Sequence, residues 1–340
     1  MNTSTLKEKI MQSVDSTHSV TLINECKRSS KENETLFFLK PEFFLLEDFD
    51  KTDSLLTLIF EKINEFNIDI SGVLALKGGF LKEARIIERH YGFINRMSVE
   101  GSKLLTNEDY EKICKALSFD SLDGFIIKGG HELINSEDGF DEARVTELWY
   151  SKDSFRMGEG FYIQYHNIKG KNVIIINGFN PHQIKHYTDR DSKIVLFLLQ
   201  TDTDWTALRS RFVGDTFPES AAEGSIRNIL YRNAEKYGIK SISVADNFVH
   251  TSSGPFDALF EICNFASNIK GVNFSRYNTN IYYLMKEKFG LTETDFKNSI
   301  DNPTAVINGE KTDLFSFTKN KNTLEAITEY KNYFMGKIAG

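Results

Sequence analysis

Hydrophobic and polar positions along the first part of the chain alternate between the period of a helix and that of a strand. Leu6, Ile10, Met11 and Val14 recur at helical spacing and predict a short leading helix, followed by a polar linker over residues 26–34. β-Branched and aromatic runs then mark strands, and longer amphipathic runs mark helices. The predicted order is strand, helix, strand and helix, over residues 35–40, 54–66, 68–77 and 82–91.

The middle of the chain, residues 92–191, has short strand patterns between glycine-rich turns, and we interpret it as an insertion. Its strands are expected at 125–127, 161–165 and 172–177. The earlier pattern resumes with a strand at 194–199, helices at 205–212, 225–237 and 255–265, and a strand that ends near Phe248. The last helices are expected at 276–289, 292–300 and 323–334, with Asn322 as the final N-cap.

Composition narrows the class of protein. The 340 residues are 40% hydrophobic and 26% charged, which provides a large core and excludes disordered and fibrous proteins. The net charge of −7 disfavours nucleic acid as a partner. Three scattered cysteines, Cys26, Cys114 and Cys263, exclude a disulfide framework. Without a signal peptide or a long apolar run, we expect a cytoplasmic protein with no membrane partner.

The segment 245–261 has the strongest chemical signal. A strand is expected to end at His250, and Gly254-Pro255 to open a helix. A histidine at such a junction can act as a nucleophile if a carboxylate orients its second ring nitrogen, and Glu261 is the candidate. Taken alone, a histidine beside serines is more often structural.

Other short motifs change this estimate. The run Asn247-Phe-Val-His250-Thr-Ser252 has Glu261 eleven positions after the histidine. Four further motifs accompany it along the chain: Lys40-Pro41-Glu42, His90-Tyr91, Gly214-Asp-Thr216-Phe-Pro218 and Gly224-Ser-Ile-Arg227. Together, and in their order along the chain, the five motifs resemble the active-site motifs of nucleoside diphosphate kinases.

The resemblance covers somewhat under half of the chain, and it implies an α+β protein built on a ferredoxin-like α/β sandwich with a four-stranded antiparallel sheet. The expected kinase-like catalytic domain comprises residues 35–92 and 193–266. Around it we expect an N-terminal helix and linker over 1–34, an inserted α+β subdomain over 93–192 and a helical extension over 267–340.

The resemblance also implies a ping-pong reaction, in which His250 takes the γ-phosphate of ATP or another nucleoside triphosphate and passes it to an acceptor. Magnesium is expected on the phosphates, with few or no protein ligands. The implied roles are Glu261 orienting His250, Lys40 and Tyr91 at the transferring phosphate, Thr216 and Arg227 at the β-phosphate, Asn247 at the ribose hydroxyl and Ser252 at the Glu261 carboxylate.

The chain departs from the family pattern in two places. Where the family has an arginine four residues before the glycine of Gly-x-Thr, this chain has Ser210, flanked by Arg209 and Arg211. We expect Arg209 to substitute, with Arg211 as the alternative. About 100 residues also follow Tyr91 where the family has a short lid, so we expect base recognition to be rebuilt. Whether the insertion forms a new acceptor pocket or leaves the substrate unchanged stays open.

Three other motifs are weaker. His182-x-x-x-His186 has metal-ligand spacing, but no third ligand follows and Pro181 suggests a loop, so we expect no metal site. Gly158-Glu-Gly160 lacks the third glycine of a dinucleotide fingerprint, and no phosphate-binding P-loop motif is present. A modest basic excess in the insertion favours an ordinary solvated surface, at Arg156, Lys169, Lys171, Lys185 and Arg190.

Three hypotheses follow. The first is a nucleoside diphosphate kinase-like phosphotransferase, with nucleotides as partners and a possible homo-oligomer. The second is a specialised kinase whose small phosphorylated acceptor binds to the insertion. The third is a nucleotide-sensing module without turnover, which the loss of the arginine at position 210 supports and the retained His250 and Glu261 oppose.

Overall fold

The computed structural model describes residues 3–14, 16–46, 48–136 and 139–335. It divides into two compact units, the first from residues up to Phe80 and from Arg190 onward, and the second from Leu81 to Asp189. Within the described ranges, no helix is both long and apolar enough to cross a membrane. Each unit is described by itself.

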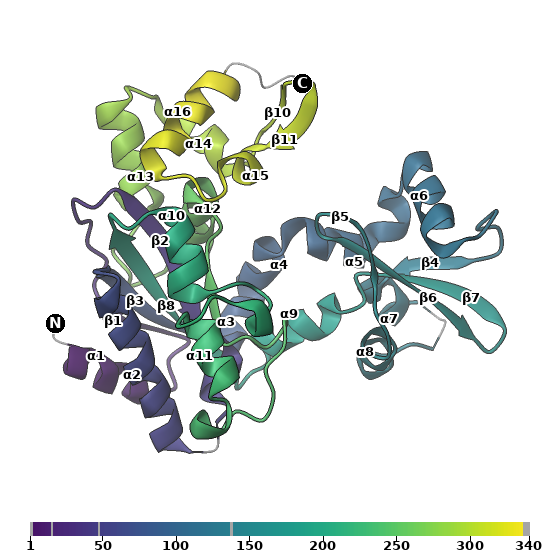
Figure 1. Ribbon diagram of the computed structural model, residues 1–340, viewed down its shortest axis with the longest axis horizontal. Helices are drawn as coiled ribbons and strands as arrows, with labels where there is room; N and C mark the ends of the chain where they lie inside the picture. The colour runs from purple at the N-terminus through teal and green to yellow at the C-terminus, as the bar shows by residue number, and fades with distance from the viewer. Residues whose placement is uncertain (1–2, 15, 47, 137–138, 336–340) are drawn as a thin grey trace. The chain divides into compact units, whose positions relative to one another are not determined.

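A five-stranded antiparallel sheet forms the centre of the first unit (Figure 1). Its order is β1 (Val20–Asn24), β3 (Asp69–Lys77), β8 (Lys193–Thr201), β2 (Asn33–Leu39) and β9 (Val249–Thr251). The sequence predicted a sheet of four strands, all after residue 34, and only a helix and a linker before them. The fifth strand, β1, lies within the leading segment, where β-branched residues favour extended backbone and Val20 pairs with Leu76 of β3.

Both faces of this sheet are covered, and every residue of β2 is buried. On one face, Phe37 and Leu39 belong to a core shared with helices α1 (Thr3–Val14), α2 (Phe49–Glu65) and α11 (Ile226–Arg232). On the other face, Phe38 packs on Phe265 of helix α12 (Pro255–Ala266), with 5.5 Å between ring centroids. Successive β2 side chains therefore point to opposite layers.

Local geometry around the site differs from the prediction in two ways. The expected helix 205–212 is a short helix, α10 (Trp205–Ala207), followed by a π-helical turn, Leu208–Val213. The strand expected to end near Phe248 instead begins at Val249, because Phe248 has a left-handed φ of 68° that extended backbone does not tolerate. His250 thus lies inside β9. The shorter turns are the 3-10 segments Pro41–Phe44, Pro218–Ser220 and Glu235–Tyr237.

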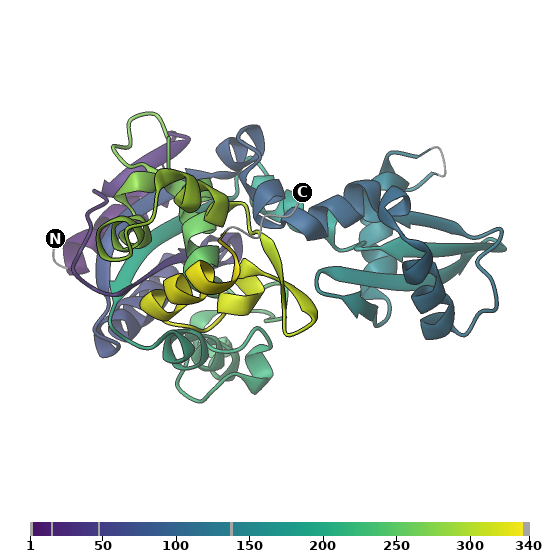
Figure 2. The ribbon, with the colours of Figure 1, turned by 90° about the horizontal axis from the view of Figure 1, so that it is seen from above.

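The C-terminal segment, from residue 267, packs around its own hydrophobic core, which includes Phe256 and Leu259 of α12. Its elements group together in both ribbon views (Figures 1 and 2). They are Arg276–Asn278, α13 (Asn280–Tyr283), Leu284–Lys288, α14 (Glu293–Ile300), β10 (Thr304–Ile307), β11 (Glu310–Asp313), α15 (Leu314–Thr318) and α16 (Thr323–Tyr333). The segment was expected to be helical, but β10 and β11 form a hairpin.

Asn322 does not cap α16 with its side chain as expected. Its Oδ1 instead accepts hydrogen bonds from the Trp205 backbone N at 3.0 Å and the Asn33 Nδ2 at 3.1 Å. The start of α16 is thereby joined to β2 and α10, the elements that lead into the site.

The second unit contains a mixed four-stranded sheet, in which β4 (Ile126–Gly129) is parallel to β7 and the other pairs are antiparallel. The other strands are β7 (Lys171–Ile176), β6 (Phe161–Ile168) and β5 (Phe155–Gly158). Helix α3 (Gly78–Glu83) runs across the boundary between the units. The helices that follow are α4 (Ile86–His90), α5 (Gly92–Leu104), α6 (Asn107–Leu117), α7 (Gly130–Ile134), α8 (Glu142–Tyr150) and α9 (Asn180–Thr188).

Two predictions for this region are wrong. The helix expected over 82–91 is broken between α3 and α4 at Arg85, whose φ of 52° is left-handed. Pro181 does not mark a loop, because it occupies the first turn of α9, where a missing N–H costs nothing.

Candidate active site

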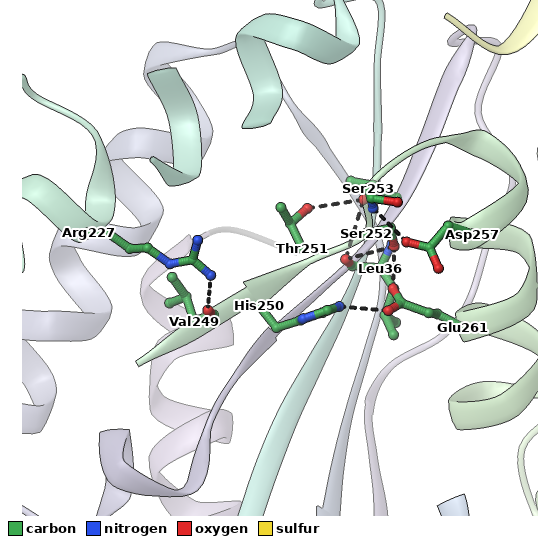
Figure 3. A network of polar contacts seen from close by, with 10 residues as sticks. Leu36, Arg227, Val249, His250, Thr251, Ser252, Ser253, Asp257 and Glu261 are labelled. Carbon is green, nitrogen blue, oxygen red and sulfur yellow. Dashed lines mark hydrogen bonds and ion pairs between the residues drawn. The ribbon is translucent and has the colours of Figure 1, made fainter. Parts of the chain in front are cut away.

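A histidine and a buried carboxylate meet between β9 and α12 (Figure 3). The Nε2 atom of His250 lies 2.7 Å from Oε1 of Glu261. The other carboxylate oxygen, Oε2, accepts a hydrogen bond of 2.5 Å from Ser252 Oγ. Only residues 252–254 separate the end of β9 from Pro255, where α12 begins, so one short turn places Glu261 opposite His250.

The ring of His250 is held on two sides. It stacks on Phe38, with 4.5 Å between ring centroids and 20° between planes. Since a carboxylate accepts but does not donate, the contact with Glu261 places the imidazole proton on Nε2. In the neutral ring the lone pair is then on Nδ1, the atom that could act as a nucleophile.

The surroundings keep this ring neutral. Burial lowers the pKa of His250, while the negative charge of Asp257 opposes that change. The positive charges of Lys40, Arg227 and Arg209 lower the same pKa further. A neutral histidine surrounded by three cations suits attack on an anionic electrophile, because the cations attract the substrate without protonating the nucleophile.

Lys40 directly follows the last residue of β2, Leu39, and its side chain is buried. Its Nζ donates a 2.9 Å hydrogen bond to the Ala245 carbonyl, and burial lowers its pKa to about 8. The neighbouring Glu42 accepts a 2.8 Å hydrogen bond from the backbone N of Phe248. The Lys-Pro-Glu motif is therefore attached to the segment that leads into His250.

Arg227 lies in the first turn of α11 and is also buried. Its Nη1 donates to the Gly214 carbonyl at 3.0 Å, and its Nη2 to the Val249 carbonyl at 2.8 Å (Figure 3). Gly214 has a φ of 96°, and a Cβ there would collide with Ser225 Oγ, so the turn requires glycine. These contacts place the guanidinium beside the strand that carries the histidine.

Asn247 carries a buried side-chain acceptor, its Oδ1 atom. Its side chain is 3% exposed, and Nδ2 donates to the carbonyls of Val244 at 2.9 Å and Thr216 at 3.4 Å. Among the described residues, none donates to the buried Oδ1. A buried acceptor in this condition fits the hydroxyl of a ligand. The side chain of Thr216 itself is exposed.

The two candidate arginines differ clearly in environment. Arg209 is half-buried, and burial lowers its pKa, whereas Arg211 is exposed. The π-helical turn explains which one reaches the site, because the N–H of Gly214 bonds to the carbonyl five residues earlier, at 3.0 Å. A π turn takes up one extra residue compared with an α-helix. The fifth residue before Gly214 thus takes the place that the fourth would have in an α-helix.

Asp257, which the sequence analysis missed, is a second carboxylate at the site. Its Oδ2 accepts a 2.7 Å hydrogen bond from the backbone N of Ser253. Burial raises its pKa to about 6, and the charge of Glu261 raises it too. The available signal was its position four residues before Glu261, which places both carboxylates on one face of a helix.

Tyr91 belongs to the second unit. It follows α4, and its ring centroid lies 4.8 Å from that of His90 and 6.3 Å from that of Tyr187. The residues of the first unit that the structure brings together are Lys40, Arg209, Arg227, Asn247, His250, Ser252 and Glu261. A contact between Tyr91 and the transferring phosphate stays a prediction.

No family model matches this chain, and no curated protein matches it. Two solved nucleoside diphosphate kinases are similar to it in structure. The enzyme from Encephalitozoon cuniculi shares 12% identity over 74% of this chain and 99% of its own, with a TM-score of 0.35. The enzyme from Pyrobaculum aerophilum shares 18% identity over 69% of this chain and 96% of its own, with a TM-score of 0.35.

Proposed function

We propose that this protein is a nucleoside diphosphate kinase-like phosphotransferase, which moves the γ-phosphate of a nucleoside triphosphate through His250 to a nucleoside diphosphate. The observation that carries the proposal is the 2.7 Å contact between His250 Nε2 and the buried Glu261 carboxylate, with basic side chains around the ring. A nucleotide-binding module without turnover has no need of an oriented nucleophile.

The chemical step is an in-line displacement at the γ-phosphorus. The Nδ1 lone pair of His250 forms the new P–N bond, and the bond from the γ-phosphorus to the bridging oxygen breaks. The electron pair leaves with the nucleoside diphosphate. Because the phosphorylated ring is positively charged, the Glu261 carboxylate at Nε2 stabilises it. A second nucleoside diphosphate then attacks the phosphorus and restores the neutral imidazole.

The basic side chains near His250 supply positive charge to the phosphates of the donor. The three phosphates of the donor repel a nucleophile, so positive charge around them lowers the barrier. The charges of Lys40, Arg227 and Arg209 all act on His250, and Arg209 belongs to the π-helical turn. Asn247, with its buried Oδ1, is suited to accept a hydrogen bond from a ribose hydroxyl.

Magnesium fits the proposal as an ion carried by the nucleotide. The two carboxylates at the site already have partners: Glu261 contacts His250 and Ser252, and Asp257 accepts a hydrogen bond from the backbone N of Ser253. These carboxylates hold the nucleophile and its loop, so we assign the ion to the phosphates. When bound there it neutralises charge on the transferring group.

The chain path in the first unit is consistent with the proposal. Without β1, the strand order is β3-β8-β2-β9, with helix α2 between β2 and β3 and helix α11 between β8 and β9. This β-α-β, β-α-β path supports the ferredoxin-like sandwich that we propose for the first unit. The second unit enters between β3 and β8, so it occupies the connection between the two halves.

The test follows phosphate through both half-reactions. Wild-type protein incubated with γ-labelled ATP and magnesium should take up acid-labile, alkali-stable label, and His250→Ala should take up none. His18→Ala removes an exposed histidine and should label as the wild type does. Discharge of the label by nucleoside diphosphates supports the proposal, whereas a labelled protein that discharges only to another acceptor supports the specialised kinase. A protein that binds ATP but takes up no label contradicts it.

A further inference from the structure

The C-terminal segment reaches the active site through one turn. The turn 318–322 begins at the last residue of α15 and leads into α16, and the backbone N of Asn320 donates to the carbonyl of Ser253 at 3.1 Å. Ser253 lies three residues after His250, on the loop between β9 and α12. A segment about 70 residues later in sequence therefore contacts the loop that carries the nucleophile.

Gly254 permits this close approach. A Cβ at this position would lie 2.9 Å from the Thr318 carbonyl oxygen and 3.1 Å from the Cα of Lys319. The backbone of Gly254 is extended, so it is the lack of a side chain that the site requires. The two loops are packed backbone against backbone.

The side chain of Asn320 meets the arginine of the π-helical turn. Its Oδ1 accepts a 2.5 Å hydrogen bond from Nη1 of Arg209. Asn320 has a φ of 63°, a left-handed conformation that asparagine adopts more readily than most residues. The end of the turn is also fixed, since Asn322 accepts a hydrogen bond from the backbone of Trp205.

An arginine side chain is long and loses considerable rotamer freedom when it is held in place. One of its five N–H donors goes to Asn320, while the charge of Arg209 lowers the pKa of His250 and interacts with Asp257. The contact thus orders the guanidinium close to the nucleophile before any nucleotide binds. Preorganised charge of this kind favours the transition state of phosphoryl transfer.

We propose that Asn320 is a positioning residue, which holds Arg209 against the phosphates of the donor, and that the turn 318–322 is therefore part of the active site. This inference rests on the proposed phosphotransferase function. It also gives a physical reason why an arginine at position 209 can act without one at position 210: the π turn brings it to the site, and Asn320 holds it there.

The test compares Asn320→Gly with Asn308→Gly. Both positions have left-handed backbone, which glycine keeps, but Asn308 lies in the β10–β11 hairpin and is not part of the 318–322 turn. We expect Asn320→Gly to lower kcat/KM for phosphohistidine formation about tenfold, and Asn308→Gly to change it less than twofold. Equal effects of the two variants, or faster labelling by Asn320→Gly, would overturn the inference.

A double-mutant cycle separates positioning from folding. In an Arg209→Ala background, Asn320→Gly should cost less than a further twofold, because the residue it positions is gone. A full tenfold loss in that background means that Asn320 acts through the fold, which overturns the inference. If Asn320→Gly does not fold, Asn320→Asp replaces it: the carboxylate keeps the acceptor and competes with phosphate for Arg209, so the KM for ATP should rise, and an unchanged KM contradicts the proposal.

The same variants distinguish failure of the inference from failure of the proposed function. If the wild type takes up no label, calorimetric titration with a non-hydrolysable ATP analogue and magnesium measures the contact instead. If Arg209→Ala and Asn320→Gly each weaken binding of the analogue, and the double variant binds no more weakly, the positioning role stands although the phosphotransferase function fails. Unchanged binding in Asn320→Gly overturns the positioning role as well.

Discussion

Replacement of Glu261 by glutamine removes a charge from the site with little change of shape. The amide oxygen of Glu261→Gln can still accept from His250 Nε2, and its NH₂ group can donate to Ser252 Oγ. Ser252 can in turn donate to the Leu36 carbonyl, 3.4 Å away. The variant is therefore expected to fold, and its rate of phosphohistidine formation measures the contribution of the negative charge of Glu261.

The size of the effect follows from the hydrogen bond that changes. A hydrogen bond to a charged group contributes about 1.5–3 kcal/mol net, and a neutral one about 0.5–1.5 kcal/mol. The difference, about 1–2 kcal/mol, applies to the phosphorylated ring, which is positive, more than to the neutral ring before attack. At 1.4 kcal/mol for each factor of ten, phosphohistidine formation should slow by about 5- to 30-fold.

Rapid-quench measurement of the first half-reaction at saturating ATP tests this value. Nucleotide affinity should change less than the rate, because Glu261 contacts the histidine rather than the phosphates. Glu310→Gln, which removes an exposed carboxylate on β11, should label as the wild type does. A Glu261→Gln protein that is folded and labels at the wild-type rate would refute the role given to this carboxylate.

Three further predictions concern other parts of the first unit. Burial lowers the pKa of Lys40 to about 8, so binding of ATP near pH 8 should be accompanied by proton uptake, seen by calorimetry in buffers of different ionisation enthalpy and absent in Lys40→Arg. Gly254→Ala should lower the free energy of unfolding, measured with denaturant, by about 1–3 kcal/mol, because the new Cβ would lie 2.9 Å from the Thr318 carbonyl oxygen. Gly158→Ala, with open space around the new Cβ, should lower it less. Burial raises the pKa of Glu34 from 4.5 to about 7, so the native state binds more protons than the unfolded state between these values. The free energy of unfolding should therefore fall as pH rises through this window, by about 3 kcal/mol, and Glu34→Gln should flatten the profile. A wild-type profile parallel to that of the variant contradicts the assignment.

The parts of the site that the sequence predicts well are local in the chain. His250, Ser252 and Glu261 lie within twelve residues, and a strand, a proline-initiated helix and helical spacing are enough to bring them together. Strand β2 and helix α12 were also anticipated, because continuous apolar runs and amphipathic spacing have clear periods.

The parts that were missed depend on long-range contacts or on small changes of backbone register. Asn320 meets Arg209 across more than 100 residues, and no spacing rule predicts that contact. The π-helical turn differs from an α-helix by one hydrogen-bond register, so the pattern of side chains left Arg209 and Arg211 as alternatives. Strand β1 carried a signal in its β-branched residues, but its short length and polar surroundings favoured a linker.

The position of the phosphate on the histidine ring tests the central claim most directly. Wild-type protein phosphorylated by ATP and magnesium, denatured under alkaline conditions and examined by ³¹P NMR against the two phosphohistidine isomers, reports which nitrogen of His250 was the nucleophile. With Nε2 donating to Glu261, the account predicts phosphate on Nδ1. Phosphate on Nε2, or on a residue other than His250, would contradict it.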